Sequence, residues 1–270
     1  MFCKLFGANK KCYIQESSKP ATINKSIAYK TPVANIYKPF ETLTAQPHLL
    51  IAGATGSGKS VTLNGIITTL IAKNSPAKCL FYLVDPKRVE LNQFKNLPHT
   101  VRYATENNEI IDSMKQLISV MENRYKTMQL LNQKDYNNGP DIYLIIDELA
   151  DIMTTNKKEF SPLLQRIAQL GRAAKIHSII CTQSVLVQIL PSVIRCNYPV
   201  IVGLRTATAQ QSRLLIQVNG CENLPDPKTT GTGYAIIRDG ADMYRTMMYK
   251  YPDTVINGLI DYWSSDKCIA

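Results

Sequence analysis

The stretch LLIAGATGSGKS, residues 49–60, decides the fold of this 270-residue chain. An apolar run at 49–52 leads into GATGSGKS at 53–60, which fits the pattern G-x-x-x-x-G-K-[ST], and a helical pattern follows. In this strand–loop–helix context the pattern binds phosphates. Its glycines let the main chain turn N–H groups toward phosphate oxygens, and the amino end of the helix adds a positive dipole. The sequence therefore predicts a nucleotide site in this loop.

Each position of the loop has an expected role in holding a nucleotide. The residues predicted to contact it are Gly53, Ala54, Thr55, Gly56, Ser57, Gly58, Lys59, Ser60 and Val61. We expect Lys59 to neutralise charge on the β- and γ-phosphates and Ser60 Oγ to ligate Mg²⁺. ATP and Mg²⁺ are therefore the predicted cofactors. The alternative, a chance glycine-rich loop, would not require every position of the pattern to match.

A second apolar run, residues 142–146, ends in Asp147-Glu148. We expect Asp147 to hold Mg²⁺ through water and Glu148 to act as the general base that polarises the attacking water. The alternative is that one of the two carboxylates only caps the following helix. Because a kinase has no need of the second carboxylate, the pair favours hydrolysis. Gln183, after the run at 176–181, is a candidate γ-phosphate sensor, and the alternative is a loop glutamine without that function.

The rest of the chain alternates short apolar runs with amphipathic stretches, which is typical of a mostly parallel sheet with helices on both faces. Strands are predicted at 49–52, 79–84, 142–146, 176–181 and 199–204. Helices are predicted near 59–73, 108–131, 159–174 and 208–218, and a loop at 132–141. The pattern at 233–249 predicts a C-terminal β-hairpin around the turn DGAD. We therefore expect one α/β domain over 41–270, preceded by a basic arm over 1–40.

The composition favours a polyanion as partner. The net charge is +10, and residues 1–50 hold seven lysines against two glutamates. Such an excess favours nucleic acid, and the alternative is a solubilising tail. The seven cysteines are scattered without a CxxC pair, which argues against a zinc site or a disulfide framework. No stretch approaches 18 apolar residues, so we expect no transmembrane segment and a cytoplasmic location.

Several stretches resemble, in register, the FtsK/SpoIIIE/HerA family of ATPases. The matching motifs are PHLLIAGATGSGKSV (47–61), FYLVDPKRVEL (81–91), NLPH (96–99), MENRYKTM (121–128), IIDELADIM (145–153), GRAAKIHSIICTQ (171–183), NYPVIVGLRTATAQQSRLLI (197–216) and GCEN (220–223). The resemblance implies a RecA-like P-loop ATPase fold. It also implies an ATP-driven translocase of double-stranded DNA that binds DNA without sequence preference and works as a homo-oligomeric ring, expected to be a hexamer.

By the same resemblance, an arginine from a neighbouring subunit completes the ATP site by neutralising charge in the transition state. Arg213, in QQSR, is the first candidate, Arg172, in GRAA, is the second, and Arg124, in ENRY, is the third. The alternative for each is a surface ion pair. One departure from the family pattern follows the fourth predicted strand, where relatives read TQRP and this chain reads TQSV at 182–185.

We expect the chain, which ends near residue 270, to lack the winged-helix module, membrane helices and extra ring-forming domain of chromosomal relatives. We expect a minimal form, like those of mobile elements or viruses, acting in the host cytoplasm. Conjugative transfer, handling of plasmid or phage DNA, and genome packaging all stay open, as does the recruiting protein. The alternative function is an ATPase of a secretion-type machine that moves protein substrates. A third hypothesis is a binding module with an inactive nucleotide site.

Overall fold

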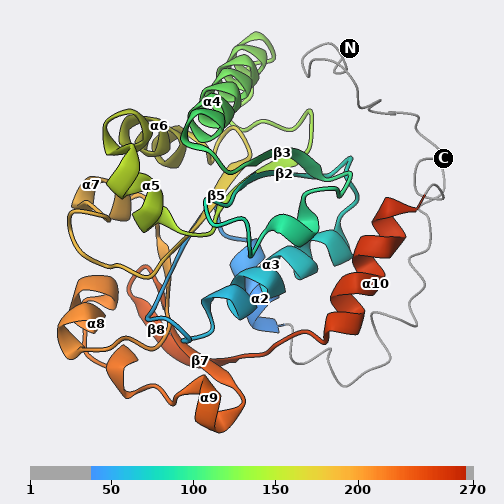
Figure 1. Cartoon of the computed structure of the whole chain (residues 1–270). Helices are drawn as coiled ribbons and strands as arrows, with labels where there is room; N and C mark the ends of the chain where they lie inside the picture. Colours follow the sequence, from blue (N-terminus) through green and yellow to red (C-terminus); the bar gives the residue numbers. More distant parts are fainter. Residues whose placement is uncertain (1–37, 266–270) are drawn as a thin grey trace.

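The computed structural model describes residues 38–265. Within this range a mixed sheet of eight strands forms the centre of the protein (Figure 1). The strands are β1 His48–Ala52, β2 Cys79–Val84, β3 Thr100–Ala104, β4 Asp141–Ile146, β5 Ile176–Thr182, β6 Val200–Gly203, β7 Gly233–Asp239 and β8 Asp242–Met248. Their order across the sheet is β3-β2-β4-β5-β1-β6-β7-β8. The first six are parallel and β7 and β8 are antiparallel, which confirms the mostly parallel sheet and its C-terminal hairpin.

Helices cover both faces of this sheet. They are α2 Lys38–Thr44, α3 Lys59–Lys73, α4 Asn107–Leu130, α5 Leu149–Thr155, α6 Lys157–Leu170, α7 Ser192–Arg195, α8 Ala209–Ile216, α9 Pro227–Thr230 and α10 Asp253–Ser264. One hydrophobic cluster joins the sheet to α4, α5, α6 and α8, and a second joins it to α2, α3 and α10. Figure 1 shows these two groups of helices on opposite sides of the strands. The prediction of helices on both faces is therefore confirmed.

Several elements of the fold were not predicted from the sequence. β3 is a short strand at one edge of the sheet, and it pairs only with β2 among the described residues. α5 follows directly after Asp147-Glu148, and α10 docks its apolar side chains against α3 near the end of the described chain. The predicted hairpin turn is present, with Gly240 in the left-handed region at φ 59°.

The predicted boundary between arm and domain, after residue 40, falls inside α2. Phe40 is completely buried and stacks on Tyr251 with ring centroids 5.9 Å apart. Phe40 also lies against Gly65 of α3, so α2 packs as part of the domain. The remainder of the predicted arm, residues 1–37, lies outside the described residues.

The order of the strands determines where a ligand can reach several loops at once. β1 lies at the centre, with β5 on one side and β6 on the other. In an open parallel sheet a ligand binds beyond the carboxyl ends of the strands, where connections leave in opposite directions. The loop after β1 carries the phosphate-binding pattern, so the fold places it at this position. No helix among residues 38–265 is long and apolar enough to cross a membrane.

Candidate nucleotide-binding site

The phosphate-binding loop, or P-loop (residues 53–60), has the main-chain geometry that its glycines predict. Gly56 has φ 77° and Gly58 has φ 100°, both in the left-handed region where a side chain would be strained. α3 begins at Lys59, directly after Gly58, so the first N–H groups of the helix face the loop. This is the arrangement in which main-chain donors and the helix dipole attract phosphate together.

The P-loop is held from both sides by hydrogen bonds to the main chain. Gly53 N–H donates to Thr182 O of β5 at 3.4 Å, and Ala54 N–H donates to Arg205 O, beyond β6, at 2.8 Å. A β-carbon built on Gly53 would lie 2.6 Å from Ser57 Oγ and 2.7 Å from Leu204 Cβ. Any side chain at Gly53 would therefore displace the loop from its position between the two strands.

Glu148 lies at the carboxyl end of β4 and faces the P-loop. Its side chain is almost fully buried, with Oε2 3.7 Å from Lys59 Nζ and 3.8 Å from Lys87 Nζ. Oε1 accepts hydrogen bonds from Gln183 N–H at 3.0 Å and from Ala150 N–H at 3.4 Å. The bond to Ala150 caps α5, as the alternative hypothesis expected. The two lysines show that the carboxylate also belongs to the P-loop site.

Gln183 is brought directly to the P-loop. Thr55 Oγ1 donates to Gln183 Oε1 at 2.8 Å, while the main-chain N–H of Gln183 is bonded to Glu148. The peptide that follows β5 thus touches both the loop after β1 and the carboxylate after β4. Gln183 therefore lies beside the P-loop, and its role as a γ-phosphate sensor stays a prediction.

Glu90 is a site residue that the sequence analysis did not single out. It lies in the segment after β2 that returns to α3, and its Oε1 accepts a hydrogen bond from Ser60 Oγ at 2.6 Å. Burial, together with the nearby carboxylates of Glu90 and Asp85, raises the pKa of Asp147 to about 7. Crowded carboxylates beside a hydroxyl form a set of oxygen donors whose mutual repulsion a cation would relieve.

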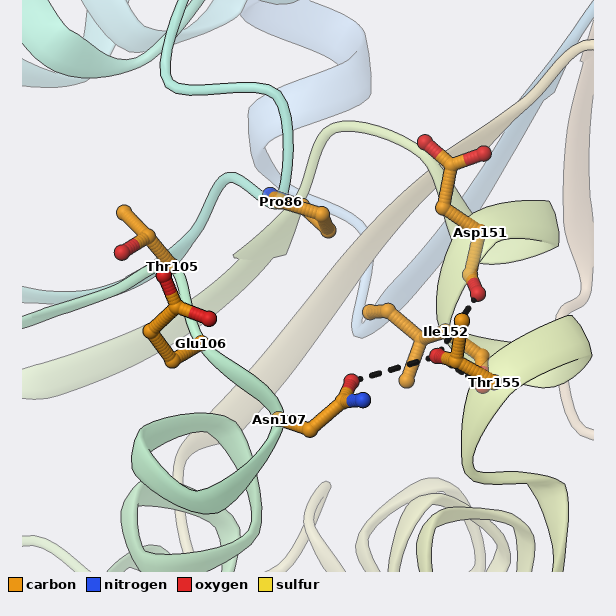
Figure 2. Close-up of a pocket in the computed structure, with 7 residues that line it drawn as sticks. All are labelled: Pro86, Thr105, Glu106, Asn107, Asp151, Ile152 and Thr155. Atoms are coloured by element: carbon orange, nitrogen blue, oxygen red, sulfur yellow. Dashed lines mark hydrogen bonds between the residues drawn. The ribbon is translucent and has the colours of Figure 1, made fainter.

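Lys87 connects this site to a neighbouring pocket. Partial burial would lower the pKa of Lys87, but the carboxylates of Asp151, 3.3 Å away, and Glu148 raise it. Asp151 lines a pocket of about 180 Å³ between the loops after β2 and β3 and the helix α5. In Figure 2, Asn107 and Thr155 face each other across it, with Thr155 Oγ1 donating to Asn107 Oδ1 at 3.1 Å. The pocket therefore opens beside the carboxylates rather than at the P-loop itself.

The three candidate arginines occupy different environments. Arg213, on α8, is exposed and donates to Asn219 Oδ1 at 2.7 Å. Arg172 is exposed and lies near His48, at the amino end of β1. The P-loop of the same chain follows the carboxyl end of β1, so Arg172 lies at the opposite end of the strands. Both have a surface available to a second subunit, and their roles stay predictions.

Arg124 has a structural role instead. It is 4% exposed, and its guanidinium donates at 2.7 Å to the carbonyls of Ala174 and Pro140 and stacks over the Tyr136 ring. These bonds hold together the segments that enter β4 and β5. An arginine finger must reach out of its own subunit, so the hypothesis for Arg124 is wrong.

The chain is also similar in sequence to a known family of proteins. A model of the FtsK/SpoIIIE family matches residues 15–141 and 130–187. The DNA translocase FtsK of Helicobacter pylori strain J99 is 37% identical over 224 residues, which cover 78% of this chain and 26% of the relative. FtsK of Staphylococcus epidermidis strain RP62A is 36% identical over 201 residues, which cover 67% and 25%. The chain thus spans about a quarter of the length of these curated relatives.

Two solved structures are also similar. The pCW3 conjugation coupling protein TcpA, in a monomer form with ATPγS, superposes with a TM-score of 0.69 at 25% identity, over 82% of this chain and 66% of that one. The cytoplasmic domain of the Type VII secretion ATPase EccC of Thermomonospora curvata gives 0.67 at 23% identity, over 79% and 28%. The EccC likeness concerns the fold alone.

Proposed function

The chain belongs to the FtsK/SpoIIIE family, and from that membership we propose that it is an ATP-driven motor that moves double-stranded DNA. The observation that carries the ATPase half of this proposal is the position of Glu148, buried at the end of β4 and paired with the P-loop Lys59. The DNA half rests on relatives named DNA translocases and on the net charge of +10. Each half has its own test.

In this proposal the P-loop amides and Lys59 bind the phosphates, and Ser60 and Asp147 hold Mg²⁺. Their oxygen donors fit that ion, and a cation would offset both the burial and the carboxylate repulsion that raise the pKa of Asp147. When bound, Mg²⁺ supplies positive charge to the triphosphate. Phosphate oxygens compete with Glu148 for Lys59, which leaves the carboxylate free to accept a proton from water. Gln183, bonded to Thr55, orients that water or senses the γ-phosphate.

The test of the ATPase is a matched pair of carboxylate-to-amide changes. Glu148→Gln should keep ATP binding and reduce hydrolysis by about a hundredfold or more, because an amide cannot take the proton. Asp151→Asn is the control, since Asp151 also pairs with Lys87 but forms no ion pair with Lys59. Lys59→Ala should remove nucleotide binding. Hydrolysis at the wild-type rate in Glu148→Gln would show that another group is the base.

We further propose a homo-oligomeric ring, a hexamer, that grips the DNA backbone without reading its sequence. Contacts to phosphates position a protein on DNA but carry no sequence information. The logarithm of affinity should then fall linearly with the logarithm of salt concentration, by roughly 0.9 for each phosphate neutralised. Two unrelated duplexes should bind equally, and double-stranded DNA rather than a protein extract should stimulate ATPase activity. A strong preference for one duplex would contradict this half of the proposal.

The lysine-rich residues before α2 are proposed to supply part of the DNA contact. Deleting residues 1–37 leaves α2 and its buried Phe40 in place. The shortened protein should bind ATP normally but show weaker DNA binding and a flatter salt dependence. An unchanged slope would assign DNA binding to the domain alone. Conjugative transfer, handling of plasmid or phage DNA and genome packaging are the settings that this activity would serve.

A further inference from the structure

Lys228 lies beside the middle of the P-loop. It belongs to the short helix α9, more than 150 residues beyond the loop in the sequence. A β-carbon built on Gly56 would lie 3.2 Å from Lys228 Cε and 3.7 Å from its Nζ. The ammonium group therefore sits beside the middle glycine of the segment whose amides face a bound phosphate.

The position of Lys228 is fixed by bonds that also hold the P-loop. Asp226 caps α9 by accepting a hydrogen bond from Lys228 N–H at 3.0 Å, and its other oxygen accepts one from Arg205 Nη1 at 2.8 Å. The carbonyl of the same Arg205 accepts the bond from Ala54 N–H at 2.8 Å. Arg205 thus connects α9, which carries Lys228, to the P-loop.

The charge of Lys228 is not balanced inside the described part of the chain. The other two lysines of the site, Lys59 and Lys87, both pair with Glu148. Lys228 is exposed and takes part in none of the ion pairs found among residues 38–265. A cation held beside the amino end of α3 adds to the positive potential of the helix dipole, and both attract an anion to this place.

We propose that Lys228 is a second lysine of the phosphate site and binds the phosphate chain of the nucleotide held by the P-loop. This inference rests on the proposed function, since it assumes a nucleotide in the loop. A DNA phosphate has the same chemistry, but the bonds through Arg205 tie Lys228 to the nucleotide loop and not to an independent surface. Lys228 would add a positive charge beside Gly56 to the one that Lys59 supplies at the start of α3.

The test compares Lys228→Ala, Lys228→Arg and a control, Lys126→Ala. Lys126 is an exposed lysine two residues beyond Arg124, whose bonds place that part of α4 near the segments that enter β4 and β5, at the opposite end of the strands from the P-loop. Binding of ATP and ADP is measured calorimetrically in the presence of Mg²⁺, with thermal unfolding of the free proteins as a check on folding. Loss of one charged hydrogen bond predicts about tenfold weaker ATP binding for Lys228→Ala, largely restored in Lys228→Arg and absent in Lys126→Ala.

Failure of the inference can be told apart from failure of the proposed function. Equal ATP affinities for wild type and Lys228→Ala would overturn the inference and leave the ATPase standing. Unchanged ATP affinity together with weakened DNA binding would also overturn it, because Lys228 would then contact DNA. If the wild-type protein bound no ATP, as is expected for Lys59→Ala, both the proposed function and this inference would be overturned.

Discussion

Replacing Gly65 with alanine should destabilise the protein, although the same change in a helix interior ordinarily stabilises by about 1 kcal/mol. Gly65 lies inside α3, and a β-carbon built there would be 2.4, 2.7 and 2.9 Å from three ring atoms of Phe40. Phe40 is completely buried and stacked on Tyr251, so its ring has no free space into which it could move. The glycine is therefore required by the packing of α2 on α3.

The magnitude follows from two opposing effects. Overpacking a filled core costs about 1–3 kcal/mol, and contacts this short belong in the upper part of that range. After the helix gain of about 1 kcal/mol is subtracted, Gly65→Ala should lower the free energy of unfolding by about 1–2 kcal/mol. Phe40→Ala alone should lower it by about 3–5 kcal/mol. With the ring removed, Gly65→Ala should stabilise by about 1 kcal/mol, which makes the two sites coupled by about 2–3 kcal/mol.

The assay is urea unfolding of the wild type, the two single variants and the double variant, without nucleotide. Trp263, the single tryptophan, is buried against the His99 ring and supplies the fluorescence signal. Gly258→Ala is the control, because a β-carbon at that position in α10 would touch nothing within 4 Å. If Gly65→Ala stabilises the wild type as much as Gly258→Ala does, the packing of Phe40 on α3 is wrong.

Three further predictions concern pH, the core and assembly. Burial lowers the pKa of His48 and of His99 to about 4. Between pH 6.5 and 4 the unfolded chain therefore binds protons that the folded protein does not, which lowers the free energy of unfolding as the pH falls. Each ring should therefore contribute about 2 kcal/mol less stability at pH 5 than at pH 7.5, and glutamine in place of either should remove about 2 kcal/mol of this pH dependence in urea unfolding; a profile that glutamine leaves unchanged would contradict this. Arg124→Ala should destabilise by about 3 kcal/mol by leaving buried carbonyls without donors, yet leave ATPase activity per folded molecule unchanged. Arg213→Ala and Glu148→Gln are each expected to be inactive, and mixing them should restore activity at mixed interfaces; co-assembly without rescue would exclude Arg213 as the finger.

The part of the fold that is predictable from sequence is the part with long apolar runs. The runs at 79–84 and 142–146 became β2 and β4 because strands buried on both faces need continuous apolar residues. β3 was not predicted, because it is a five-residue edge strand with Arg102 exposed in its middle and has no continuous apolar run. α10 had a signal, since Ile256, Leu259 and Trp263 recur at helical spacing, but a single short stretch near the end of the chain gives little context.

The site residues that were predicted from the sequence also differ from those that were missed. Lys59 and Glu148 belong to local patterns in which the strand and the following loop are adjacent in sequence, so the pattern itself places them. Glu90 and Lys228 reach the P-loop only because distant segments fold back onto it, and no spacing between residues 60 and 228 predicts that. Glu90 did lie within the family motif at 81–91, which is the signal that would have identified it. An arginine that acts across an interface cannot be identified from one chain by either route.

The attachment of the P-loop on both flanks has a mechanical consequence. The N–H groups of Gly53 and Ala54 donate to carbonyls at the end of β5 and beyond β6, and no space is left for a side chain at Gly53. A loop fastened in this way cannot shift as a unit when a phosphate arrives or leaves. A change on nucleotide binding is therefore expected first in the side chains that lie beside the loop, such as Gln183 and Lys228, rather than in the main chain of the loop.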